Sequence, residues 1–250
     1  MQIRAALLPD LAGDVSGAVC IVVDVLRATT VISTLFAQGC PEVYVAGNHD
    51  SAAKFARSKG YVLCGETSGW KAPGFDYGNS PVEFSTLDFT EKPVVLSTTN
   101  GTKAIQKVSS ARAVLLGAAV NQMSVAREAW RIARESQSDI TIVCSGTDGH
   151  FTLEDAIVAG LYVEAISGFA GAWEMPEQDD SAIAVRRLWE ADSNLLRSII
   201  EGKHAVKLAD KGFGEDIGCC TAVDTIQNAP ILQSSITKIE WPWPVYLIDD

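Results

Sequence analysis

Apolar runs alternate with helical patterns along the first part of the chain. Ala18–Asp24 is an apolar run rich in β-branched residues that ends on an acid, which is typical of a strand buried on both faces of a sheet. Arg27–Gln38 supplies helix-forming residues and stops at Gly39. The same order then repeats, with a strand at 41–46, a helix at Ser51–Lys59 and a strand at Tyr61–Cys64. This alternation predicts a largely parallel sheet covered by helices.

An irregular stretch, 65–93, interrupts the alternation. It is rich in Gly, Pro, Ser and Thr and is longer than most connections in a compact domain, so we expect a functional or mobile loop. The alternation then resumes, with strands expected at Val94–Leu96, Ala113–Leu116 and Ile140–Val143 and helices at Asn100–Val108, Asn121–Ser136 and Leu153–Phe169. The pattern as a whole predicts an α/β fold whose sheet is largely parallel or mixed.

The C-terminal part of the chain is less regular. Ser181–Ile200 predicts one helix and His204–Ala209 another, and 212–220 is expected to form an acidic turn flanked by glycines. Trp241–Ile248 contains two prolines, which favours an edge strand or an arm docked on the core. The loop-like stretch 172–180 is a candidate boundary between two sub-domains of a single domain that spans 1–250.

The composition limits the classes of partner. The chain has 250 residues, and its net charge of −11 leaves little basic surface for a phosphate backbone, so we expect no nucleic-acid partner. An anionic ligand would need a cation or a local cluster of Lys and Arg to offset this field. No apolar run reaches the roughly 18 residues of a membrane helix, and the N-terminus lacks a signal-peptide pattern. The six cysteines lack metal-ligand spacing, which favours reduced thiols in a cytoplasmic protein.

Polar side chains follow the end of the first predicted strand. Asp24 ends that strand, Arg27 comes three positions later, and Thr29 and Thr30 open the next helix. In an α/β sheet, ligands bind beyond the carboxyl ends of the strands. A carboxylate there suits Mg²⁺, a guanidinium suits an anionic oxygen, and the start of a helix suits a phosphate. An alternative interpretation is that Asp24 only pairs with Arg27 and caps the helix.

Three further segments carry groups of the same kind. Thr98–Thr102 combines hydroxyls, an amide and a glycine and is followed by Lys103, as in loops that hold phosphate, although the Walker A spacing is absent. The irregular stretch contributes Glu66, Asp76 and Asn79. Glu154 and Asp155 begin a helix, where one of them is expected to be a cap and the other to reach the site.

Several other chemistries lack their sequence signatures. The aspartyl-phosphate phosphatases need a second acid two positions after the nucleophile, and Leu26 stands there, so Asp24 is not assigned as a covalent nucleophile. The sequence has no H-E-x-x-H segment, no Cys/His cluster suited to zinc, no G-x-S-x-G elbow and no dinucleotide fingerprint. A magnesium site with oxygen ligands is the chemistry that remains.

Taken in order along the chain, these segments resemble the 2-phosphosulfolactate phosphatase family, of the coenzyme M biosynthesis type. The matching segments are 23–30, 65–66, 74–81, 98–102, 144–155 and 215–217. The resemblance implies an α/β/α layered fold with a topology peculiar to the family. It also implies a magnesium-dependent phosphatase that hydrolyses 2-phospho-3-sulfolactate, a small phosphorylated anion, to 3-sulfolactate and phosphate.

We assign candidate roles to these residues as a hypothesis. The expected metal ligands are Asp24, Glu66, Asp76 and Asp155. The expected substrate-binding residues are Arg27, Thr29, Thr30, Asn79, Thr98, Thr99, Asn100, Gly101, Thr102 and Lys103. The residues expected to take part in catalysis are Asp24, Arg27, Glu66 and Glu154, with Glu66 or Glu154 orienting the attacking water.

Two positions depart from the pattern expected of the family. Lys103 stands where an Arg is expected, and Thr67–Trp70 stands where a more basic, glycine-rich stretch is expected. These changes motivate an alternative function, a non-catalytic anion-binding or regulatory module on the same fold. Another alternative is a metal-dependent enzyme that acts on a different small acid. A homodimer is also expected, with Trp241–Ile248 either at the partner surface or docked on the core.

Overall fold

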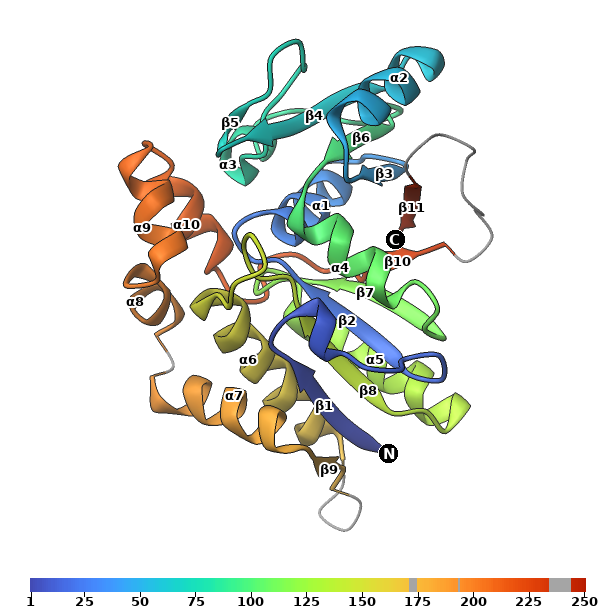
Figure 1. Cartoon of the computed structure of the whole chain (residues 1–250), viewed down its shortest axis with the longest axis vertical. Coiled ribbons are helices and arrows are strands. Elements are labelled where there is room, and N and C mark those ends of the chain that lie inside the picture. Colours follow the sequence, from blue (N-terminus) through green and yellow to red (C-terminus); the bar gives the residue numbers. More distant parts are fainter. Residues whose placement is uncertain (171–174, 193, 234–243) are drawn as a thin grey trace.

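The computed structural model describes residues 1–170, 175–192, 194–233 and 244–250, and over these residues it has one mixed sheet with helices on both faces (Figure 1). The strands are β1 Gln2–Ala6, β2 Val19–Val23, β3 Val43–Ala46, β4 Val62–Thr67, β5 Trp70–Lys71, β6 Val94–Ser97, β7 Ala113–Gly117, β8 Ile140–Cys144, β9 Glu177–Gln178, β10 Ile231–Leu232 and β11 Val245–Asp249. The helices are α1 Ala28–Ala37, α2 His49–Lys59, α3 Pro81–Phe84, α4 Asn100–Val108, α5 Gln122–Ser136, α6 Leu153–Phe169, α7 Asp180–Ala191, α8 Leu195–Ile200, α9 Lys203–Asp210 and α10 Gly214–Cys220, with a 3₁₀ turn, η1, at Pro9–Leu11.

Successive residues of β2 pack into cores on opposite faces of the sheet. Val19, Ile21 and Val23 belong to the core that contains α5 and α6 residues. Cys20 and Val22 belong to the core that contains α1 and α4 residues. All five side chains are fully buried, because side chains alternate between the faces of a strand and both faces are covered by helices. This arrangement confirms the predicted three-layer α/β/α fold.

The sheet contains two parallel groups of strands. Its order is β5-β4-β6-β3-β11-β10-β7-β2-β8-β1-β9, with parallel pairing among β4, β6 and β3 and again from β7 to β9. Between these groups, β11 pairs antiparallel with β3 and β10, and β10 pairs antiparallel with β7. The prediction of an edge strand at the C-terminus is therefore wrong for the described residues, because Val245–Ile248 has a strand on each side. Residues 241–243 of that predicted segment lie outside the described part of the chain.

Three other sequence predictions need correction. The expected acidic turn at 212–220 is a helix, α10, from Gly214 onward. The expected helix at Ser181–Ile200 is interrupted, because α7 ends at Ala191 and the side chain of Asn194 accepts the N–H of Arg197 to start α8. The N-terminal strand β1 was not predicted. The candidate boundary at 172–180 stays a prediction, and its residues 172–174 lie outside the described residues.

The structure bears on the predictions about the cysteines and about membrane helices. All six cysteines are free, and five of them are buried. None of the helices in the described residues is long and apolar enough to cross a bilayer. The homodimer, the cytoplasmic location and the absence of a nucleic-acid partner stay predictions.

Gly160→Ala is expected to destabilise the protein on the order of 3 kcal/mol. Gly160 lies in α6 where α7 packs against it, and a Cβ there would meet the backbone carbonyl of Val185, whose carbon lies 2.6 Å from that position. Backbone cannot move aside as a flexible side chain would. Gly168→Ala in the same helix is the matched control, because a Cβ there has no atom within 4 Å, and we expect it to be neutral or slightly stabilising. Urea unfolding checks both values, and equal midpoints for the two variants would contradict the prediction.

Candidate active site

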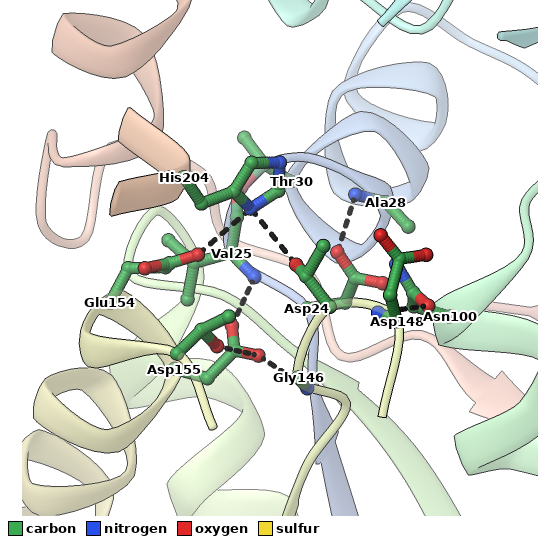
Figure 2. Close-up of polar contacts among 12 residues, drawn as sticks. Asp24, Val25, Ala28, Thr30, Asn100, Gly146, Asp148, Glu154, Asp155 and His204 are labelled. Carbon is green, nitrogen blue, oxygen red and sulfur yellow. Dashed lines mark hydrogen bonds and ion pairs between the residues drawn. The ribbon is translucent and has the colours of Figure 1, made fainter. Parts of the chain in front are cut away.

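The candidate site is a cavity of about 240 Å³ at the carboxyl ends of β2, β6 and β8, with further lining residues from β4 and α9. Of the residues predicted from the sequence, it is lined by Asp24, Arg27, Glu66, Asn79, Thr98, Thr99 and Asn100. The N–H of Asp148, in the loop after β8, donates to Asn100 Oδ1 at 3.3 Å, which joins the ends of β8 and β6 (Figure 2). The site therefore occupies the edge of the sheet where the sequence places its polar segments.

Asp24 is a buried carboxylate at the end of β2. Its side chain is almost enclosed, and Oδ1 accepts the N–H of Ala28, the first residue of α1, at 3.3 Å (Figure 2). Burial raises the pKa of Asp24 to about 6, and the negative charges of Glu154 and Glu66 add to this rise. The N–H of Ala28 and the charge of His204 act in the opposite direction. A carboxylate held in this way favours a bound cation that would restore its charged form.

Arg27 does not pair with Asp24. Its Nη1 forms an ion pair with Asp216 of α10 at 2.6 Å, and both side chains are 2% exposed. Its Nη2 donates to the carbonyl of Gly69 at 2.9 Å, and the guanidinium lies 4.5 Å from the ring centroid of Phe213. Ser80 Oγ donates to the other oxygen of Asp216 at 2.6 Å. Arg27 borders the cavity, yet its donors hold α10 and the β4–β5 turn together, so the interpretation that paired it with Asp24 is wrong about the partner.

Two of the four predicted metal ligands lie elsewhere. Asp76 Oδ2 accepts the N–H of Leu63 at 2.9 Å, and Asp76 does not line the cavity. Asp155 is buried and accepts the N–H groups of Val25 at 2.9 Å and Gly146 at 3.0 Å and the hydroxyl of Thr152 at 2.9 Å (Figure 2). Among the described residues, no cluster of three or more His, Cys, Asp or Glu side chains is arranged to hold a metal. Of the predicted metal ligands, Asp24 and Glu66 therefore line one cavity, whereas Asp76 and Asp155 do not.

Several predicted substrate-binding residues do not line the cavity. The hydroxyls of Thr29, Thr30 and Thr102 donate to the carbonyls four or five residues before them, at 2.7–2.9 Å, and none of these side chains lines the cavity. Gly101 brings α4 close to the site, because a Cβ there would lie 3.0 Å from Asp24 Oδ2. Lys103 is exposed and borders a different cavity. The departure from the family pattern at Lys103 therefore lies outside the candidate site.

Glu66 and Asn79 bring side-chain oxygen atoms to the cavity. Glu66 Oε2 accepts the N–H of Gly69, and Glu66 Oε1 has no hydrogen-bond partner among the described residues. Asn79 is buried, and its Oδ1 is one of the few enclosed polar atoms in the described chain that lack a hydrogen-bond partner. A buried oxygen that accepts no hydrogen bond destabilises the folded state unless a ligand or a water molecule contacts it.

One face of α9 was missed by the sequence interpretation. His204, Lys207 and Leu208 line the cavity, and their spacing places them on one side of the helix. This spacing was visible in the sequence as a helical pattern with a lysine and a histidine on the same face. Lys211, which caps the C-terminus of α9, lines the cavity as well. His49, on α2, also lines the cavity, and its two ring nitrogens contact Ser97 Oγ at 2.7 Å and Thr67 Oγ1 at 3.1 Å. The two lysines give an acidic protein a local pair of cations at the cavity.

Comparison with known proteins identifies the family. A sequence model described as 2-phosphosulpholactate phosphatase matches residues 7–235. The chain belongs to the 2-phosphosulfolactate phosphatase family. Relatives described as probable 2-phosphosulfolactate phosphatases include those of Deinococcus radiodurans, 37% identical over 93% of both chains, and Caldanaerobacter subterraneus, 34% identical over 87% of this chain and 89% of the relative. A third, from Gloeobacter violaceus, is 34% identical over 92% of this chain and 94% of the relative.

Membership of the 2-phosphosulfolactate phosphatase family makes the chain a phosphoric monoester hydrolase and confirms the resemblance seen in the sequence. Such an enzyme must hold a phosphoryl group, offset its negative charge and direct water at phosphorus. Carboxylates, hydroxyls, the N-terminus of α4 and two lysines around one cavity can meet these needs. The cavity therefore contains the kinds of side chain that hydrolysis of a phosphate ester requires.

Proposed function

We propose that the protein hydrolyses 2-phospho-3-sulfolactate to 3-sulfolactate and phosphate with Mg²⁺ as its cofactor. The observation that supports the proposal is that carboxylates and lysines line the same cavity. Asp24 and Glu66 line it together with Lys207 and Lys211. A substrate with phosphate, carboxylate and sulfonate groups needs both a cation between its phosphate and the carboxylates and further cations for its other end.

The oxygen atoms at the cavity fit a magnesium ion. Mg²⁺ prefers hard oxygen ligands and is usually held by one or two carboxylates together with water and substrate phosphate. Asp24 and Glu66 would supply the carboxylates, and Asn79 Oδ1 would supply a neutral oxygen that lacks a partner in the described chain. When bound, the ion would act as a Lewis acid that offsets charge on the phosphoryl oxygens.

The remaining residues of the site would bind and orient the substrate. Thr99 and Asn100 lie at the N-terminus of α4, and the start of a helix favours a phosphate. Thr98, directly before them, also lines the cavity, and its own N–H donates to the carbonyl of Ala46. Lys207 of α9 and Lys211, the residue directly after that helix, would bind the carboxylate and sulfonate as point charges. Glu66 would orient the attacking water, because the structure directs Glu154 toward His204 instead.

Phosphate release from 2-phospho-3-sulfolactate, with Mg²⁺ and with EDTA, tests this proposal. We expect release with Mg²⁺ and a fall of about 100-fold with EDTA, since the Lewis acid contributes several kcal/mol. Phospholactate, which lacks the sulfonate, is the matched substrate control, and we expect it to be slower because one anionic contact is lost. Faster release from phospholactate would show that 2-phospho-3-sulfolactate is not the preferred substrate. Undiminished release in EDTA would contradict the proposal that Mg²⁺ is the cofactor. If no compound of a phosphorylated hydroxy-acid panel released phosphate, the non-catalytic anion-binding module would replace the proposal.

A further inference from the structure

His204 is held by a buried carboxylate, that of Glu154. Its Nδ1 lies 2.9 Å from Glu154 Oε1 and 3.2 Å from Thr147 Oγ1 (Figure 2). The Glu154 side chain is 2% exposed and that of His204 is 20% exposed. A histidine whose Nδ1 donates to a carboxylate has its tautomer and ring orientation fixed by that bond.

The backbone brings these two side chains together from distant parts of the chain. Glu154 lies in the first turn of α6 and His204 in the first turn of α9. Gly202 starts α9, and a Cβ at this position would lie 2.9 Å from the carbonyl oxygen of Ile199 and 3.5 Å from Glu154 Oε2. The glycine therefore allows the tight turn from α8 into α9, which begins beside the Glu154 carboxylate.

The other ring nitrogen of His204 is available to a ligand. Nε2 has no hydrogen-bond partner among the described residues, and His204 lines the cavity that also contains Asp24 and Glu66. The charge of His204 acts on Asp24, so the two groups share one electrostatic environment. His49 differs from His204 in this respect, because both of its ring nitrogens already contact hydroxyl groups.

We propose that His204 is the general acid that protonates the leaving oxygen of the phosphate ester, with Glu154 as its positioning residue. This inference rests on the proposed phosphatase function. An alkoxide from a secondary alcohol is a poor leaving group, so a proton donor is most needed at the ester oxygen. Imidazole is the side chain used most often for proton transfer near neutral pH, and such transfer typically contributes 100-fold to 10,000-fold in rate.

The step balances in atoms and charge. The bond between phosphorus and the ester oxygen breaks, and a bond forms between phosphorus and the oxygen of water. The proton comes from the imidazolium form of His204, in which Nδ1–H donates to Glu154 and Nε2 carries the second proton. The ester oxygen takes the proton from Nε2 and becomes the hydroxyl group of the product, and the ring is left as neutral imidazole. The dihydrogen phosphate that forms gives one proton to solvent, and the imidazole takes one proton back from solvent.

A substrate with sulfur in place of the bridging ester oxygen tests this role. A thiol is far more acidic than an alcohol, so a thiolate leaves without being protonated. We expect His204→Gln to lower kcat for the oxygen ester about 100-fold or more while leaving kcat for the sulfur-bridged ester within about fivefold of the native protein. Glutamine keeps the size and polarity of the side chain on α9, and circular dichroism with thermal unfolding checks that the variant is folded.

Two further variants separate proton transfer from a structural role. Glu154→Gln removes the carboxylate that orients the ring, and we expect a smaller loss, of about tenfold, that is again confined to the oxygen ester. His49→Gln is the matched control, and any loss it causes is expected to be the same for both esters.

The outcomes distinguish this inference from the proposed function. Equal losses for both esters in His204→Gln, or no loss for either, would overturn the assignment of His204 while leaving the phosphatase function intact. A native protein that releases no phosphate from the oxygen ester would overturn the proposed function and this inference with it.

Discussion

Asp24→Asn is expected to abolish measurable phosphatase activity and, in EDTA, to make the protein more stable. The activity should fall about 1,000-fold or more, because the variant loses the charged ligand at the end of β2 and metal assistance is worth several kcal/mol. Asparagine has the same shape and keeps an oxygen for the N–H of Ala28, so the start of α1 should be preserved. Steady-state phosphate release measures the loss.

The gain in stability follows from the pKa of Asp24. Its folded value is raised from 3.8 to about 6 by burial, so the carboxylate destabilises the folded state once it is charged. That cost is absent below about pH 4, grows as the pH rises and is complete above about pH 6, where it is on the order of 2–3 kcal/mol. Asparagine is neutral throughout, so Asp24→Asn should be more stable than the native protein at pH 8 and equal to it near pH 4. Urea unfolding in EDTA at both pH values measures the difference.

Magnesium and a second variant provide the controls for Asp24. Added Mg²⁺ should stabilise the native protein and not Asp24→Asn, because ligand binding to the folded state alone raises its stability. Asp76→Asn should keep most of the activity, since Asp76 holds the N–H of Leu63 outside the cavity. Native-like activity in Asp24→Asn would refute the proposed metal site. A lower stability of this variant at pH 8 would refute the argument from burial.

Arg27→Met is expected to lower the free energy of unfolding by about 3–5 kcal/mol. The substitution leaves the Asp216 carboxylate buried without its counter-ion and removes the contact of the guanidinium with the carbonyl of Gly69. For a chain of this size, the loss corresponds to a fall in Tm of roughly 6–20 °C. Activity should fall as well, because α10 and the β4–β5 turn border the cavity and would lose their common anchor.

Two comparisons identify the buried ion pair as the cause. Arg131 forms ion pairs with Glu128 and Glu135 on the surface of α5, with its side chain half-exposed, and Arg131→Ala should cost less than about 1 kcal/mol. The double variant Arg27→Met with Asp216→Leu should recover part of the stability, since it removes both buried charges. If Arg27→Met unfolds at the same temperature as Arg131→Ala, the guanidinium has no anchoring role.

The fold and the position of the site could be predicted because their signals are local. Val19–Val23 and Ile140–Cys144 are apolar on both faces of a strand, and such runs can only be buried between helices. Polar residues directly after these strands must lie at the carboxyl edge of the sheet. Asp24, Thr98 and Asn100 were placed in the site in this way, and the structure brings them to one cavity.

The roles of the acids could not be predicted because they depend on where backbone N–H groups remain without partners. Asp155 and Asp24 both look like ligands in sequence, yet Asp155 is used to satisfy the N–H groups of Val25 and Gly146. A buried N–H group must find an acceptor, and which side chain reaches it depends on how the loops are folded. The position of β11 could not be predicted for the same reason. It lies between β3 and β10 because its backbone pairs with the hydrogen-bonding edges of both strands.

The sequence by itself determined the layered α/β architecture, the family and the edge of the sheet where the chemistry lies, because strand burial and helix periodicity act over a few neighbouring residues. Only the tertiary structure decided which groups meet there. It paired Arg27 with Asp216 and Glu154 with His204, and it brought Lys207 and Lys211 to the cavity that Asp24 and Glu66 also line. Contacts between residues so far apart in the chain are set by the packing of whole elements, and no short pattern of residues encodes that packing.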